Sequence, residues 1–229
     1  MVKIGEYNIL EVVKEKTMGV FLDDGEIGIL LPKRFVPPET KIGDKLKVFL
    51  YHDSEGRPIA TTLQPYGVLG DIVKLKVVSV THQGAFLDWG LMKDLFIPKS
   101  KMQSFMRVNG EYLVKIVMDE KTGRIAATEY LESFLSNEEL QVKVMDEVDL
   151  LVYRKTDIGY EMIINNRHKG MLHFNEVYRN IEIGDRFKGF VKNILPENKI
   201  DLSAGKAGYS RVDDETEKAL VAKTRRTIA

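Results

Sequence analysis

The chain repeats one short succession of strand-like segments three times, and this repeat limits its fold more than any other feature. Tetrapeptides that begin with glycine occur at 19–22, 84–87 and 159–162. A second apolar segment follows each tetrapeptide about ten residues later, and a third recurring segment ends each unit. The glycines stand 65 and 75 residues apart. That spacing is too long for a solenoid repeat and matches one small all-β domain.

Each unit reads as five short strands with a longer loop after the third, which is the pattern of a small barrel. The Asp24-Gly25 pair indicates a hairpin turn, because glycine tolerates a positive φ. The expected strands are 8–14, 19–23, 27–31, 45–51 and 58–63, then 71–80, 85–88, 95–97, 111–118 and 124–129, then 147–154, 160–164, 169–173, 186–194 and 199–202.

The sequence predicts three barrel domains and a different C-terminal segment. We expect domains at 1–64, 65–131 and 142–205. The connection 130–140 reads as a short helix. Residues 206–229 contain helix formers behind an acidic first turn and read as a helical tail.

Composition excludes several classes of protein. The chain has 229 residues and no cysteine, so disulfides and thiolate metal sites are excluded and a reducing cytoplasm is expected. No signal peptide and no apolar stretch of roughly 20 residues is present, so no membrane association is expected. Its 34 basic and 34 acidic residues argue against an overall basic nucleic-acid binder. Residues 93–107 nevertheless carry four basic side chains against one acid.

No catalytic constellation emerges from the sequence. The four histidines, His52, His82, His168 and His173, lack metal-ligand spacing. Neither a phosphate-cradling glycine loop nor a nucleophile elbow is found. We therefore expect no enzyme activity, no metal and no cofactor.

Three motifs in the last unit resemble the S1-type RNA-binding domain, a five-stranded OB-fold barrel. They are 169–177, 183–185 and 198–203. The second unit resembles it as well, and the first matches less closely. Three such units followed by the segment 209–220 resemble the conserved virulence factor B family of bacteria, whose members have three S1-like domains and then a winged helix. The chain ends where that winged helix would begin, so we expect it to be truncated or absent.

The resemblance implies positions for RNA contacts, since S1 domains hold unpaired bases on aromatic rings over the second and third strands. Carried over by position, the stacking residues are Phe21 and Phe86, although a Phe in such a strand is as readily a core residue. The aromatic that precedes the glycine is missing, and His82 and Trp89 are candidates to compensate in the second unit. In the third unit Glu161 stands at the stacking position.

Other candidate RNA contacts are basic or match the family's histidine. Basic loop residues follow the third strand, and further basic residues precede the fifth; the alternative for each is an ordinary solvated turn. These candidates are Lys33, Arg34, Lys99, Lys101, Arg124, His173 and Lys199.

The sequence thus predicts a non-catalytic bacterial protein that binds single-stranded RNA with its first two units, in post-transcriptional or virulence-type gene regulation. Ribosomes or other RNA-associated proteins are further candidate partners. One alternative is a protein-interaction scaffold whose barrels have lost RNA binding, which the zero net charge and Glu161 favour. Another is an accessory domain array of a nuclease or translation factor.

Overall fold

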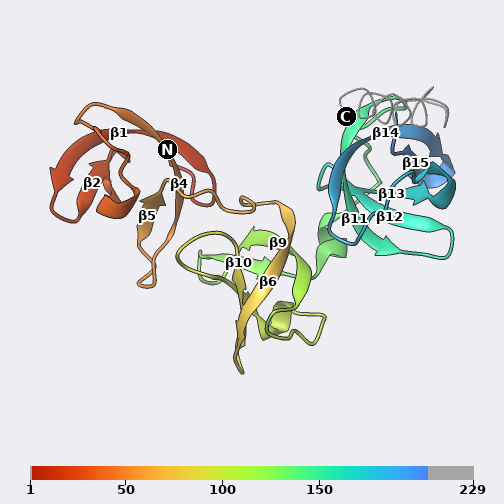
Figure 1. Ribbon diagram of the computed structural model, residues 1–229, viewed down its shortest axis with the longest axis horizontal. Helices are drawn as coiled ribbons and strands as arrows, with labels where there is room; N and C mark the ends of the chain where they lie inside the picture. The colour runs from red at the N-terminus through yellow and green to blue at the C-terminus, as the bar shows by residue number, and fades with distance from the viewer. Residues whose placement is uncertain (1, 206–229) are drawn as a thin grey trace, which may run out of the picture. The chain divides into compact units, whose positions relative to one another are not determined.

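The computed structural model describes residues 2–205, and these residues form an all-β chain with a few single 3-10 turns (Figure 1). The expected helical tail at 206–229 lies outside the described residues. Each of the expected strands is present, and most boundaries differ by one or two residues. The prediction of an all-β chain with three five-stranded barrels is confirmed.

Three groups of five strands follow one another along the chain. The first contains β1 (Tyr7–Lys16), β2 (Gly19–Leu22), β3 (Ile29–Pro32), β4 (Lys45–His52) and β5 (Pro58–Thr61). The second contains β6 (Ile72–Val80), β7 (Gly84–Asp88), β8 (Leu95–Pro98), β9 (Glu111–Met118) and β10 (Ile125–Thr128). The third contains β11 (Glu147–Lys155), β12 (Gly159–Ile164), β13 (His168–His173), β14 (Arg186–Leu195) and β15 (Lys199–Ser203).

The first and third groups are closed barrels with the same strand order. Their orders are β1-β2-β3-β5-β4 and β11-β12-β13-β15-β14, and each closes through a short parallel pairing of its third and fifth strands. The second group has the order β10-β9-β6-β7-β8, and its end strands β8 and β10 lie against each other without a ladder of hydrogen bonds, so this barrel is nearly closed. This order makes the second and third strands of every group an antiparallel hairpin.

The recurring glycine has a steric cause. A Cβ on Gly19 would stand 2.1 Å from the Leu31 carbonyl oxygen, and one on Gly84 would stand 2.1 Å from that of Ile97. The third copy, Gly159, would meet the next strand at 2.3 Å. The second strand therefore starts where the backbone of the third approaches too closely for any side chain.

A bulge in the first strand of each group curves the barrel. The register shifts between Val12 and Lys14 in β1, and at the matching places in β6 and β11. Such a bulge adds twist and redirects the side chains that follow. The residue after the bulge lies opposite the second strand of its own barrel. This residue is Lys14 in the first barrel, Ser79 in the second and Arg154 in the third.

The chain separates into two compact units, Met1–Leu131 and Glu132–Ala229. The first unit holds two barrels, and their cores touch: Phe49 and Tyr51 of β4 belong to the same apolar cluster as Trp89 and Ile97. The third barrel has its own core in the second unit. Division of the first unit at residue 64 stays a prediction.

The expected helix at 130–140 is wrong apart from one 3-10 turn, Leu131–Phe134. Tertiary hydrogen bonds hold the rest of the segment against the third barrel. The Asn137 side chain donates to the Lys169 and Asn198 carbonyls, at 2.8 and 2.9 Å, and accepts the Lys169 N–H. Buried His168 lies 2.6 Å from the Ser136 carbonyl and accepts the Gln141 N–H. These bonds replace the helical ones that local propensity favours.

Candidate nucleic-acid interface

The second barrel presents a pair of phenylalanines on its outer face. Phe86 of β7 lies directly opposite Phe96 of β8, and their ring centroids are 5.0 Å apart with the planes tilted by 46°. Their strand neighbours Ala85, Leu87 and Ile97 are buried in the core. Because side chains alternate along a strand, the two half-buried rings face outward.

This pair occupies the part of an OB barrel that commonly receives nucleic acid. β7 and β8 are the second and third strands, whose outer face is the usual ligand surface. Aromatic rings on such a surface stack on bases of any sequence, worth roughly 1–3 kcal/mol per base. Sequence reasoning selected Phe86 and missed Phe96. Pairing the two expected strands as a hairpin would have found it.

The first barrel carries one ring at the matching place. Phe21 of β2 lies opposite Leu30 of β3, and Lys14 lies across from it on β1. Lys16 Nζ stands 5.1 Å from the ring centroid, a cation–π contact. One half-buried ring beside two lysines is a smaller platform than the pair in the second barrel.

The third barrel has charges where the others have rings. Glu161 of β12 lies opposite Met171 and forms ion pairs with Arg154 and Lys169. Lys169 Nζ also lies 2.7 Å from Glu132, and this hydrogen bond is the main reason why the pKa of Glu132 is lowered. The cations on this face are thus paired with carboxylates. The face is therefore a weaker binding surface for phosphates than its basic residues alone suggest.

The family-matching residues of the third barrel have acidic partners. His173 Nε2 lies 3.3 Å from Asp201 Oδ1. Lys199 Nζ lies 2.8 Å from Glu197, and both side chains are exposed. Exposed pairs of this kind are weak, so Lys199 can exchange its partner for a phosphate at little cost.

The expected basic loops are exposed. Lys33 and Arg34 lie in the 3-10 turn Lys33–Phe35 directly after β3. Lys99 and Lys101 lie in the equivalent turn, Lys99–Lys101, after β8. His82 is exposed in the turn between β6 and β7. The two 3-10 turns follow the strands that carry the candidate rings.

Trp89 is buried, and its expected RNA contact is wrong. Its side chain is 3% exposed, and Nε1 donates to the Lys93 carbonyl at 2.6 Å. The indole meets Phe49 and Tyr51 of the first barrel edge to face, at centroid distances of 5.8 and 6.5 Å. A ring enclosed between two barrels cannot offer a face to a base.

Two basic residues of the second barrel also belong to this junction. Lys93 Nζ donates to the His52 and Asp53 carbonyls at 3.1 and 2.7 Å, and burial lowers the pKa of the ammonium. The Arg124 guanidinium lies over Gly56, 2.8 Å from where a Cβ would stand. Burial, followed by Lys93 and Arg124, lowers the pKa of His52. Arg124 thus lies beside the first barrel, although its side chain is exposed.

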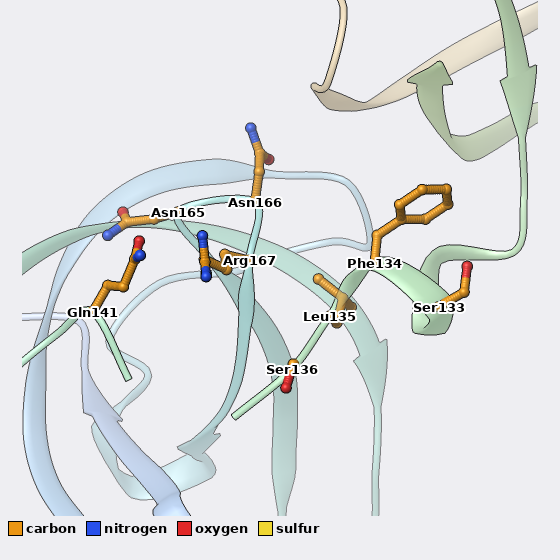
Figure 2. Close-up of a pocket in the computed structure, with 8 residues that line it drawn as sticks. All are labelled: Ser133, Phe134, Leu135, Ser136, Gln141, Asn165, Asn166 and Arg167. Carbon is orange, nitrogen blue, oxygen red and sulfur yellow. The ribbon is translucent and has the colours of Figure 1, made fainter. Parts of the chain in front are cut away.

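A polar hollow of about 510 Å³ lies in the second unit, between residues 133–141 and the β12–β13 turn (Figure 2). Asn165 and Asn166 form that turn with positive φ. Ser136 N–H donates to the Arg167 carbonyl at the hollow's edge. The hollow is accounted for by the connecting segment packing on the barrel. It contains no carboxylate or histidine and provides no acid–base pair.

Neither a metal-binding cluster nor a membrane-spanning helix occurs among the described residues. Residues 2–205 contain no group of three or more His, Cys, Asp or Glu side chains suited to a metal ion. None of the helices in this part of the chain has the length and apolar character that a membrane span requires.

Comparison with known proteins identifies the first barrel by sequence. Residues 4–63 match the S1 domain family. This is the unit whose motifs resembled that family least closely, so its framework carries more of the family pattern than the short motifs indicated. The match supports a nucleic-acid-binding role.

Longer similarities extend over most of the chain. The chain is homologous to the uncharacterized protein YitL of Bacillus subtilis, with 26% identity over 87% of this chain and 69% of that protein. It is also homologous to conserved virulence factor B of Staphylococcus epidermidis, with 22% identity over 76% of this chain and 61% of that protein. The resemblance to the virulence factor B family is thereby confirmed. The chain spans less than two thirds of the staphylococcal protein.

The chain also aligns over nearly its whole length with a solved structure. That structure is a multidomain protein with nucleic acid binding domains from Streptococcus pneumoniae TIGR4, with 16% identity, a TM-score of 0.49, and coverage of 96% of this chain and 81% of that one.

Proposed function

We propose that the protein binds single-stranded RNA through its first two barrels, with Phe86 and Phe96 as the main base-stacking platform. The facing pair of outward rings on β7 and β8 is the observation that carries this proposal. The S1 match of residues 4–63 and the single ring of Phe21 support extension of the surface to the first barrel.

Electrostatics set the expected strength and salt dependence of this binding. The net charge is zero, so affinity depends on local cations such as Lys33, Arg34, Lys99 and Lys101. Each phosphate that a cation neutralises adds a slope of about −0.7 to log K against log salt for a single strand. We therefore expect a modest slope of log K against log salt, corresponding to neutralisation of a few phosphates.

The proposed biological role is non-catalytic regulation of gene expression after transcription, in a bacterial cytoplasm. The lack of cysteine fits a reducing compartment. Ribosomes and RNA-associated proteins are candidate partners of the same RNA. The proposed domains are 1–64, 65–131 and 142–205.

One observation favours a second function, a protein-interaction scaffold. The Arg154–Glu161–Lys169–Glu132 network covers the third barrel's face with paired charges of both signs. Such a face suits a polar protein partner better than a phosphate backbone. Pull-downs with and without nuclease separate the two functions, since only protein-mediated capture survives removal of RNA.

The direct test measures binding of a fluorescent single-stranded oligonucleotide to the whole chain. We expect Phe86→Ala with Phe96→Ala to weaken binding at least about tenfold. Tyr178→Ala is the matched control, because it removes an exposed aromatic from the third barrel. Unchanged affinity in the folded double variant would show that these rings are not the platform.

A further inference from the structure

Phe105 is the most exposed aromatic residue among those that the structure describes. Its side chain is 86% exposed, in the loop between the 3-10 turn Lys99–Lys101 and β9. A large apolar ring left in water costs free energy that folding would normally recover by burial. Phe105 therefore presents nearly its whole ring to solvent and to any ligand that approaches this loop.

The loop that carries Phe105 is fastened on its N-terminal side by a buried carboxylate. Glu129 Oε2 accepts the N–H groups of Gln103 and Ser104 at 2.6 and 2.8 Å. The Glu129 N–H donates to the Lys101 carbonyl at 2.9 Å. Because two neighbouring N–H groups converge on one buried oxygen, this clamp holds the backbone next to Phe105.

The loop is fastened on its C-terminal side as well. Met106, the next residue, is buried in the barrel core. The Tyr112 hydroxyl lies 3.1 Å from the Arg107 N–H and 3.4 Å from the Phe105 carbonyl. Asn109 N–H then donates to the Val77 carbonyl at 2.9 Å. Phe105 is thus presented by an ordered loop with anchors on both sides.

The clamp is specific to the second barrel. Thr61, Thr128 and Ser203 end the fifth strands of the three barrels. The residues that follow them are Thr62, Glu129 and Ala204. Thr62 bonds only the Phe35 carbonyl, and Ala204 has no side-chain acceptor. Of the three residues at this position, only Glu129 therefore offers a carboxylate to the loop after the third strand.

The surroundings of Phe105 are basic. Residues 95–110 contain Lys99, Lys101 and Arg107, all exposed, and no acid. The nearby Glu129 side chain already accepts hydrogen bonds from the Gln103 and Ser104 N–H groups. Outside this segment, the pKa of Asp119 is lowered mainly by a hydrogen bond from the Thr122 hydroxyl. The charge of Lys101 contributes to the same lowering. A segment that combines an exposed ring with three exposed cations and no acid fits a nucleobase with phosphates beside it, whereas a purely apolar partner would gain nothing from the cations.

We propose that Phe105, with Lys99, Lys101 and Arg107, forms a second contact site for single-stranded RNA, separate from the Phe86–Phe96 pair. Phe105 stacks on a base, and the three cations take the adjoining phosphates. Glu129 is the positioning residue for the loop. This site rests on the proposed RNA binding and extends it from the strand face to the β8–β9 connection.

The first test compares side chains at one position. The probe is an oligouridine of about 12 nucleotides, within the roughly 4–16 that one OB fold covers. Phe105→Ala and Phe105→Leu should weaken binding about fivefold or more, whereas Phe105→Trp retains it. Because the ring is exposed, thermal unfolding should not change. Ile27→Ala, an exposed apolar truncation in an acidic hairpin, is the control and should bind as the unaltered chain does.

The second test observes stacking directly. The chain's single tryptophan, Trp89, is buried, so acrylamide and RNA reach it poorly. The tryptophan that Phe105→Trp introduces is exposed, so quenching in this variant reports on residue 105. Oligouridine should quench this emission and protect it from acrylamide. Quenching without an affinity loss in Phe105→Ala would overturn the proposal. Full affinity in Phe105→Leu would do so too, because it would indicate a merely apolar contact.

The outcomes separate this site from the wider function. Loss of binding in the Phe86 and Phe96 double variant with no loss in Phe105→Ala would reject the second site and leave the first. No binding by the unaltered chain would reject the proposed function itself, and this site with it.

The role of Glu129 is tested by rescue. Glu129→Gln keeps an acceptor oxygen for the Gln103 and Ser104 N–H groups and should bind nearly normally, whereas Glu129→Ala should bind more weakly. In the Glu129→Ala background, a further Phe105→Ala should cost less than it does alone. Strict additivity of the two losses would show that Glu129 does not position Phe105.

Discussion

The ring of Phe49 in the first barrel meets the indole of Trp89 in the second edge to face, with centroids 5.8 Å apart and planes at 80°. Both side chains are buried in one apolar cluster that contains core residues of the second barrel. Barrels one and two therefore share part of a core. Packing as well as the connecting residues therefore joins the two barrels that carry the proposed RNA contacts.

The shared core predicts that Phe49→Ala destabilises the first unit by about 3–5 kcal/mol, as expected for loss of a fully buried aromatic. Denaturant unfolding, followed by Trp89 fluorescence, measures the change. Phe86→Ala is the matched control and should cost clearly less, because its ring is half-buried on the outer face. Equal costs would contradict a shared core, as would separate unfolding transitions for the two barrels.

The junction also predicts a dependence on pH. The pKa of His52 in the folded chain is lowered from its ordinary 6.5 by burial, and then by Lys93 and Arg124. As pH falls through 6.5, the unfolded chain takes up a proton that the folded chain does not, so the free energy of unfolding decreases. The decrease ends at the lower pH where the folded His52 also becomes protonated.

This dependence is measured by denaturant unfolding at several pH values between neutral and acidic. The His52→Gln variant supplies the reference, because titrating carboxylates affect both proteins alike. The unaltered chain should lose more stability than the variant over the interval below pH 6.5. Parallel curves would indicate that His52 titrates equally in the folded and unfolded states.

The third barrel's ion pairs predict that Glu161→Gln strengthens binding of single-stranded RNA. The change removes the carboxylate that pairs closely with Arg154, so this cation is better able to meet a phosphate, whereas Lys169 keeps its contact with Glu132. One added phosphate contact should make the slope of log K against log salt steeper by about 0.7.

Titration of a labelled oligonucleotide at several salt concentrations tests this expectation. Asp149→Asn is the control, since it also releases a cation, Lys188, from an exposed pair but frees no candidate RNA contact. An increase specific to Glu161→Gln would place RNA on the third barrel. Equal small increases in both variants would reflect only the change in net charge.

Much of the architecture could be predicted, because every unit repeats the same local signals. Strand periodicity and the glycine at 19, 84 and 159 suffice for three barrels. The connection 130–140 was mispredicted because Asn137 and His168 bond across the fold, which local propensity does not report.

The candidate site was less predictable for the same reason. Phe86 could be found from its motif, whereas Trp89 looked equally suitable and is buried by a residue 40 positions earlier, Phe49. Phe105 carried no motif at all. The backbone next to it is held by Glu129, 24 residues later in the chain, a contact that local sequence does not report.

The close approach at the start of β7 leads to a last prediction: Gly84→Ala is far more harmful than an alanine at a positive-φ glycine that has open space around it. A Cβ at residue 84 would stand 2.1 Å from the Ile97 carbonyl oxygen, so β7 and β8 would have to separate. A cost of about 3 kcal/mol or more is expected, at the high end for single substitutions.

Gly43→Ala is the matched control for this prediction. Gly43 has a φ of +95° with nothing within 4 Å of a Cβ, so it measures backbone strain without the clash. That strain alone should cost about 1 kcal/mol. Thermal unfolding of both variants separates the two effects. If the two costs were similar, conformational preference would explain the repeated glycine; a much larger cost at Gly84 would show that β8 excludes a side chain there. In that case the hairpin that carries Phe86 and Phe96 depends on the glycine at its first position.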